Sequence, residues 1–186
     1  MAVSARRGAP LSPEEIYSTA LRLVEEGGVD ALSMRKLAAA LDVNPMSLYH
    51  HVENKTALIA QICRTMAGRL ELPVQSGESW QERLRRLAHA YRRLVSTYPS
   101  LWTYIHTHPE VVATHEGGLW DVLFPIMAEA GVPEEERTRT ADVLHGFVTG
   151  LILTEQQGHI GRDDPEEVTR TFETAIDMII RGLPHH

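Results

Sequence analysis

The chain has 186 residues, of which 43% are apolar, and its formal net charge is −7. This apolar share is enough for a substantial core and excludes wholesale disorder, while the single cysteine, Cys63, excludes an intramolecular disulfide and is typical of a reducing compartment. Because no apolar leader and no unbroken apolar run of ~20 residues occurs, we expect a cytoplasmic protein that does not span a membrane.

The charge is unevenly distributed along the chain. Residues 1–70 carry 8 lysines and arginines against 7 aspartates and glutamates, whereas residues 71–186 carry 10 against 18. The first segment is therefore nearly neutral, and the acidity belongs to the second. Such asymmetry indicates that the two segments have different tasks.

Four helices are predicted in the first segment. The first begins with a capping box at residues 12–15 and ends at the two glycines 27–28. Ser33 caps a second, short helix, and a three-residue break at 42–44 separates it from a third. Asn54 caps the fourth helix.

The second segment also has helical periodicity throughout. After a joint at 73–77, a capping box at 79–82 opens a helix, and Pro99 and Pro109 bracket a short segment. Further helices are predicted at about 119–130, 133–157 and 165–181. No segment alternates with period two for long enough to suggest a sheet, so the predicted fold is all-α. We expect a first domain at residues 10–56 and a second domain at residues 57–186.

The spacing in residues 33–52 follows the plan of a helix-turn-helix unit. Small Ala38 lies where the two short helices must approach each other, Val43 fills the turn, and Leu48 anchors the second short helix. The outward residues of that helix are small, aromatic or hydrogen-bonding, and none is acidic, which suits a major groove. With the basic residues nearby, the candidate DNA contacts are Ser33, Arg35, Lys36, Pro45, Met46, Ser47, Tyr49, His50, His51 and Lys55.

Each of these residue types offers a definite contact. Pro45 and Met46 suit thymine methyl groups, and Ser47 can bond a base edge or a phosphate. Tyr49 and Lys55 suit phosphates, as does His51, while Arg35 can reach the DNA backbone or a guanine, and Lys36 the backbone. An ordinary packing module of three capped helices is the alternative interpretation.

Residues 12–70 resemble the N-terminal domain of the TetR family of bacterial repressors. The resemblance is carried by Ser-Met-Arg-Lys-Leu-Ala at 33–38 and by Leu-Tyr-His-His-Val-Glu-Asn-Lys-Thr-Ala-Leu at 48–58. The latter is similar to the branch around the tetracycline repressor, and Gly-Glu-Ser-Trp-Gln at 77–81 resembles the start of that branch's ligand-binding domain.

The resemblance implies that Arg35, Ser47, Tyr49, His51 and Lys55 fall on positions that touch DNA. Pro45 and Met46 also fall on such positions but differ in type from the tetracycline repressor, so a different operator is expected. Asp42 stands where glycine is usual in the turn, and aspartate tolerates a left-handed backbone better than most residues.

The resemblance further implies a homodimer that binds an inverted-repeat operator and pairs through the last two long helices. Gly146 and Gly150 would allow close approach of helices. The alternative is that these helices close the core of the monomer.

The resemblance also implies a small-molecule effector in a cavity inside the second domain. A mixed aromatic and polar lining would suit a planar, partly apolar molecule. The candidate contacts are Met66, His89, Tyr91, Trp102, Tyr104, Ile105, His106, Trp120, Phe124, His145 and Thr149. Most aromatic and methionine residues at helical spacing are core residues, and that is the alternative interpretation for each of them.

No metal or other cofactor is expected. The tetracycline repressor holds a magnesium chelate with a histidine and a carboxylate, and the resemblance puts Tyr104 at the histidine position. The carboxylate position falls near Thr154, with Glu155 one step away. The pair of side chains that holds the magnesium chelate is therefore expected to be absent here.

Two other function classes remain open. A metal-dependent enzyme could use His106, His108 and His115 with Glu110 and Glu116, although no His-Glu-x-x-His pattern occurs. An effector-free DNA-binding dimer is the second, although the second domain is larger than dimerisation requires. The sequence favours a ligand-responsive regulator that is not an enzyme.

Overall fold

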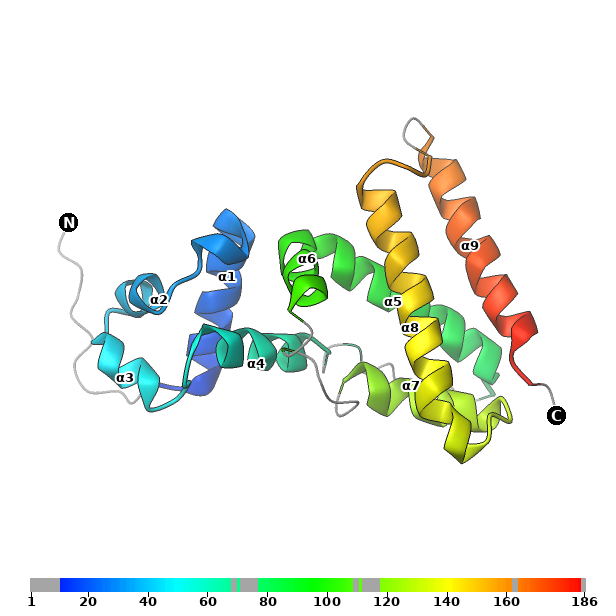
Figure 1. Ribbon diagram of the computed structural model, residues 1–186, viewed down its shortest axis with the longest axis horizontal. Helices are drawn as coiled ribbons and strands as arrows, with labels where there is room; N and C mark the ends of the chain where they lie inside the picture. Colours follow the sequence, from blue (N-terminus) through cyan, green and yellow to red (C-terminus); the bar gives the residue numbers. More distant parts are fainter. Residues whose placement is uncertain are drawn as a thin grey trace. The chain divides into compact units, whose positions relative to one another are not determined.

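The computed structural model describes residues 11–67, 70, 77–108, 111, 118–161 and 164–184. Within these ranges the regular structure is helical and contains no strand, which confirms the all-α prediction (Figure 1). The chain forms two compact units. The first comprises residues 1–65 and 100–113, and the second comprises residues 66–99 and 114–186.

The first unit contains α1 (Pro13–Ala31), α2 (Met34–Leu41), α3 (Pro45–Tyr49), most of α4 (Lys55–Ala67) and most of α6 (Pro99–Thr107). The boundary predicted after residue 56 therefore falls inside α4. A capping box holds the start of α1, because the Ser12 hydroxyl accepts from the Glu15 N–H and the Glu15 carboxylate accepts from the Ser12 N–H. Fully buried side chains of this unit include Ile16, Leu37, Leu48, Leu58 and Ile59.

The predicted end of the first helix at residues 27–28 coincides with a break in its backbone. Gly28 has φ 73° and ψ 173°, a conformation that L side chains rarely adopt, and one more helical turn then continues to Ala31. The glycine thus allows α1 to change direction before α2 begins.

The second unit contains α5 (Trp80–Thr97), α7 (Leu119–Glu129), α8 (Glu134–Gln156) and α9 (Pro165–Gly182). Helix α5 packs against the other three, and α8 packs alongside α9 (Figure 1). The predicted caps form: the Ser79 hydroxyl accepts from the Glu82 N–H, and the Asp164 carboxylate accepts from the Glu166 N–H. No helix in the described part of the chain is long and apolar enough to cross a membrane.

Candidate DNA-reading surface and ligand cavity

Local hydrogen bonds fix the turn between α2 and α3. Asp42 adopts the left-handed conformation with φ 55°, and its N–H donates to the Ala38 carbonyl. The Val43 N–H donates to the same carbonyl at 3.0 Å, and the Asn44 side chain accepts from the Met46 N–H at 2.9 Å. Asp42 therefore adopts the left-handed conformation that glycine usually takes in this turn, and Asn44 caps the N-terminus of α3.

Helix α3 presents most of its side chains to solvent. Met46 is 65% exposed and Tyr49 is 47% exposed, whereas Leu48 is fully buried and anchors the helix. The other predicted contacts here are exposed or half-buried: Pro45, Ser47, His50 and His51. An exposed thioether and phenol on a helix with one buried anchor form a surface that suits a major groove.

The predicted contacts at the start of α2 also reach solvent. Arg35 and Lys36 are exposed, as is Ser33. The Ser33 hydroxyl accepts from the Lys36 N–H at 3.2 Å, so this serine acts as the cap of α2. The two basic side chains remain available to a phosphate or a guanine.

Lys55 is half-buried and already bonded within the first unit. Its Nζ donates to the Val29 carbonyl at 2.7 Å and lies 5.8 Å from the centroid of the Tyr104 ring. That ring stacks on His108 with 3.9 Å between centroids. Lysine has three N–H donors, so the bond to Val29 and a phosphate contact are compatible.

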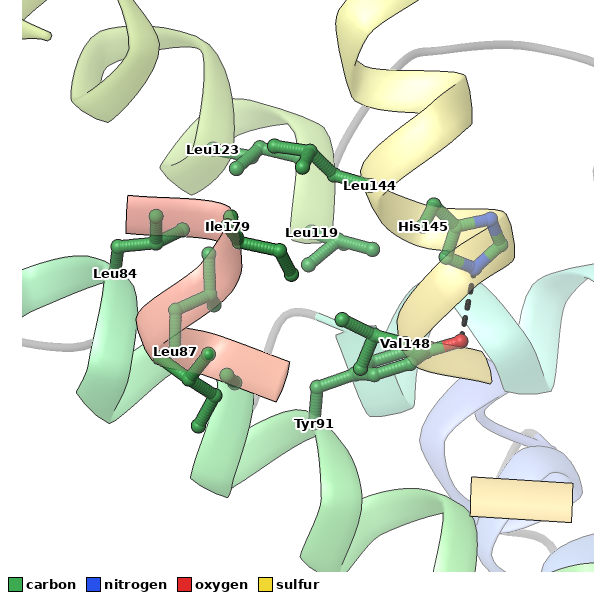
Figure 2. Close-up of a pocket in the computed structure, with 11 residues that line it drawn as sticks. Leu84, Leu87, Tyr91, Leu119, Leu123, Leu144, His145, Val148 and Ile179 are labelled. Atoms are coloured by element: carbon green, nitrogen blue, oxygen red, sulfur yellow. Dashed lines mark hydrogen bonds between the residues drawn. The ribbon is translucent and has the colours of Figure 1, made fainter. Parts of the chain in front are cut away.

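A cavity of about 50 Å³ lies inside the second unit, among α5, α7, α8 and α9. Nine of its eleven lining residues have aliphatic side chains, and the other two are Tyr91 and His145. Figure 2 shows aliphatic side chains of all four helices around it, among them Leu84, Leu87, Leu119, Leu123, Leu144 and Val148.

The polar groups at the edge of the cavity bond one another. The Tyr91 hydroxyl lies 2.8 Å from His145 Nε2, drawn as the dashed line in Figure 2, and 2.9 Å from Thr149 Oγ1. Tyr91 is 4% exposed and Thr149 is fully buried. The Trp120 ring meets the His145 ring edge-on at 5.3 Å. These polar groups therefore satisfy one another, and the surface of the cavity itself is apolar.

The structure brings together part of the predicted effector contacts. His145 lines the cavity, Thr149 bonds Tyr91, and the Trp120 ring lies 6.2 Å from that of Phe124. The other predicted contacts lie elsewhere: His89 pairs with a carboxylate of α9, Met66 is buried in α4, and Trp102, Tyr104, Ile105 and His106 belong to the first unit.

Sequence reasoning missed the aliphatic lining of the cavity. Its leucines, such as Leu84 and Leu87 one turn apart on α5, have the spacing of ordinary core residues. One signal in the sequence could have indicated a cavity: a helix with apolar residues on more than one face. Helix α8 is such a helix, because Thr149 and Ile152 are buried while Phe147 is 46% exposed.

Ion pairs join α5 to α9. The Arg85 guanidinium donates to Glu173 at 2.7 Å and to Asp177 at 2.6 Å, and His89 Nε2 lies 2.7 Å from Glu173. The hydrogen bond from Arg85 lowers the pKa of the Asp177 carboxyl below its usual value. These contacts fix the lateral position of α9 on α5.

A second pair joins α5 to α8. The Arg92 Nε and Nη2 donate to the two carboxylate oxygens of Glu155 at 3.0 and 2.7 Å. The guanidinium carbon also lies 4.6 Å from the Phe172 ring centroid, and the side chains of the pair are 17% and 21% exposed. Both oxygens of Glu155 are thus engaged by one bidentate partner.

The histidine cluster of the enzyme alternative is only partly described. His106 is exposed, and His108 Nδ1 lies 3.0 Å from the Tyr104 carbonyl. His115, Glu110 and Glu116 lie outside the described residues. Among the residues that are described, no three His, Cys, Asp or Glu side chains are grouped to hold a metal ion.

The outer side of α8 and α9 exposes large apolar residues. Val143 is 65% exposed, Phe147 46% and Met178 58%. Phe147 and Met178 also line a surface hollow of about 450 Å³ together with polar residues of α9. Gly146 and Gly150 lie on α8 with no side-chain neighbour that an added Cβ would meet within 4 Å. This face therefore has room for another helix to approach.

Comparison with known proteins assigns the chain to a family. Residues 16–62 match the family described as bacterial regulatory proteins, tetR family, and residues 72–185 match the tetracyclin repressor-like C-terminal domain. The tetracycline repressor protein class D of Escherichia coli is 32% identical over 155 residues, which cover 81% of this chain and 69% of that protein. An HTH-type transcriptional regulator of Saccharopolyspora erythraea is 27% identical and covers 87% of this chain and 66% of that protein.

Solved structures share the fold. Mycobacterium smegmatis BioQ matches with a TM-score of 0.75 at 21% identity, over 92% of this chain and 97% of that one. The Streptomyces coelicolor TetR family protein ActR, in complex with (S)-DNPA, matches with a TM-score of 0.74 at 24% identity, over 94% of this chain and 98% of that one. The two relatives described above are a repressor and a transcriptional regulator by name. The chain therefore belongs to the TetR family and is a DNA-binding transcriptional regulator.

Proposed function

We propose that the chain is a homodimeric repressor that binds an inverted-repeat operator through α3 and leaves it when a small molecule enters the cavity of the second unit. The observation that carries the proposal is the exposed side of α3. Met46 and Tyr49 are exposed there while Leu48 holds the helix to the core. Side chains of this kind add little to folding but can reach thymine methyls and phosphates.

Dimerisation follows from the operator and from the outer face of α8 and α9. The DNA-binding domains of two chains bound to an inverted repeat would contact successive major grooves about 34–36 Å apart. The exposed Val143, Phe147 and Met178 supply an apolar surface that a second copy would bury. A two-fold axis would set the same face of each copy against the other.

The release step is proposed as a shift between two dimer geometries. Helix α4 carries Lys55 in the first unit and Met66 in the second. This helix therefore links the DNA-binding domain to the ligand-binding domain along the chain. The two geometries differ in the distance between the two DNA-binding domains. A ligand that binds one geometry more tightly than the other would shift the population toward it and so change operator affinity. The proposed regulator acts in the cytoplasm and carries out no catalysis.

Selection of bound sequences from random duplex DNA tests the DNA-binding part. The purified chain is expected to enrich an inverted repeat and to give a discrete mobility shift that resists nonspecific competitor DNA. Met46→Ala is expected to alter the preferred base at one position in each half-site. Arg22→Ala, on the exposed side of α1, serves as the control. Enrichment of no sequence, or of single half-sites without a repeat, would contradict the proposal.

A further inference from the structure

Helix α6 is separated in sequence from the helices that carry the candidate DNA contacts, yet most of it belongs to the first unit. Its start lies against the break in α1, where a Cβ added to Gly28 would meet the Ser100 side chain at 3.7 Å. The same helix carries Tyr104, one of the predicted effector contacts. In the structure the centroid of the Tyr104 ring lies 5.8 Å from Lys55 Nζ, which is within the range of a cation–π interaction.

The other partner of the Lys55 ammonium lies in the last turn of α1. Lys55 Nζ donates to the Val29 carbonyl at 2.7 Å, and the same carbonyl accepts from the Leu32 N–H at 3.1 Å. A carbonyl oxygen has two lone pairs, so both bonds form together. Val29 and Leu32 are both buried, so the acceptor belongs to packed backbone. The ammonium therefore has one fixed neighbour on α1 and one on α6.

The Tyr104 ring is itself held in place. It stacks on the His108 ring with 3.9 Å between centroids and an interplanar angle of 8°. His108 is bonded locally, since its Nδ1 lies 3.0 Å from the Tyr104 carbonyl and 3.0 Å from Thr107 Oγ1. Residues four positions apart on a helical turn are neighbours, so this stack is built within one turn. It limits the rotation of the tyrosine ring beside Lys55.

The backbone of Lys55 is equally well defined. Lys55 is the first residue of α4, and the Asn54 side chain caps this helix by accepting from the Ala57 N–H at 2.9 Å. The lysine side chain is half-buried, so part of it reaches solvent. An ammonium has three N–H donors, of which Val29 takes one and the tyrosine ring can face another. A donor therefore remains for a DNA phosphate.

A lysine held in this way contacts a phosphate at a lower entropic cost. A free lysine side chain has a long, flexible stem, and it loses rotamer freedom when its ammonium is fixed. Contacts that restrict the side chain before DNA binds remove part of this loss from the binding step. The Val29 carbonyl and the Tyr104 ring restrict Lys55 in the free protein.

We propose, on the basis of the proposed function, that Tyr104 is a positioning residue for DNA binding, whose ring holds the Lys55 ammonium ready for a phosphate and so makes α6 part of the DNA-binding apparatus. Tyr104 acts through Lys55 and need not touch DNA itself. Because phosphates carry no sequence information, the contribution of Tyr104 is the same for an operator and for any other duplex.

Fluorescence anisotropy titration of the full chain with two labelled duplexes tests the proposal. The duplexes are the operator selected from random DNA and a scrambled duplex of the same length and composition. Tyr104→Leu keeps an apolar side chain but removes the ring, so it is expected to weaken binding of both duplexes by the same factor, about two- to fivefold. Tyr104→Phe keeps the ring and should bind both as the wild type does. His106→Ala, at an exposed position of the same helix, is the control.

A double-mutant cycle separates positioning of Lys55 from general damage to α6. In the Lys55→Ala background the ring has no ammonium to hold, so Tyr104→Leu should cause no further loss of affinity. A purely structural role of Tyr104 would lower the affinity by the same factor in both backgrounds. Equal losses in the two backgrounds, no rescue by Tyr104→Phe, or tighter binding by Tyr104→Leu would overturn the proposal.

The two duplexes distinguish this inference from the function on which it rests. If the chain binds both duplexes equally and Tyr104→Leu weakens both through Lys55, the proposed operator recognition fails and the positioning role stands. If the chain prefers the operator but Tyr104→Leu leaves both affinities unchanged, the proposed function stands and the positioning role is wrong. Binding of neither duplex would overturn both.

Discussion

In the first unit the candidate contacts with DNA are side chains that leave the core, whereas in the second unit the candidate contacts with an effector are side chains that form it. Met46 and Tyr49 are 65% and 47% exposed, while Tyr91 is 4% exposed and Thr149 is fully buried. Binding and stability are therefore separable at α3, where a contact can change without changing the packing. At the cavity the two are linked, because each lining residue is also a packing residue.

The anchor of α3 gives the largest effect in this comparison. Leu48 is the buried residue of a five-residue helix, so Leu48→Ala is expected to lower the free energy of unfolding by about 2–5 kcal/mol. Met46→Ala on the same helix should change it by no more than about 0.5 kcal/mol, because Met46 is exposed. Urea denaturation followed by circular dichroism measures both, and equal effects would show that α3 is not anchored as described.

The ion pair between α5 and α8 gives the next largest effect. Glu155→Gln removes the charge that Arg92 binds with two hydrogen bonds, so we expect a loss of about 1.5–3 kcal/mol in the free energy of unfolding. Glu136→Gln is the matched control, because its pair with Arg139 is exposed and worth about 0.3–0.5 kcal/mol. If Glu155→Gln lowered the free energy of unfolding no more than Glu136→Gln, the Arg92–Glu155 pair would contribute no more to stability than an exposed ion pair.

Two basic residues of the first unit are expected to differ in how they affect DNA binding. Lys55→Ala removes the bond to the Val29 carbonyl, so it should lower stability by about 0.5–1.5 kcal/mol as well as operator affinity. Arg35→Ala should leave stability unchanged, because this side chain is exposed.

Salt dependence separates the two contributions. If Arg35 contacts a phosphate, its loss reduces the slope of log affinity against log salt by about 0.9 for each phosphate contact. Operator titrations at several salt concentrations measure this slope. An unchanged slope and unchanged affinity in Arg35→Ala would remove this arginine from the DNA-reading surface.

The smallest effect is a pH dependence in the second unit. The hydrogen bond from Arg85 lowers the pKa of Asp177, so the charged carboxylate contributes stability above the ordinary aspartate pKa and loses it as pH falls through the lowered value. The stability difference between the wild type and Asp177→Asn should therefore be present at neutral pH and vanish well below pH ~4. Thermal unfolding across pH measures it, with Asp121→Asn on α7 as the control. A difference that persists in acid would show that the asparagine acts through packing.

The predictions from sequence succeeded where the signal was local. The hydroxyls of Ser12, Ser33 and Ser79 each cap a helix, and Asp42 takes the left-handed turn, because each interaction joins residues within a few positions of one another. Such patterns are readable without knowledge of the tertiary fold.

Features that join distant residues were not predictable. Arg92 and Glu155 are separated by 63 positions, and Arg85 and Asp177 by 92, so only the packing of α5 against α8 and α9 brings them together. The cavity lining was missed for a related reason, since Leu84 and Leu87 have the periodicity of any buried helix face. Nor does the sequence show that most of α6, which directly follows α5 in the chain, belongs to the first unit.

The most direct test of the account is the affinity of the chain for its selected operator compared with a scrambled duplex of the same length and composition. Fluorescence anisotropy at a fixed, moderate salt concentration gives both dissociation constants. We expect a preference of at least about 10³-fold for the operator, with two chains bound per inverted repeat. Equal affinity for both duplexes would contradict sequence-specific recognition by α3.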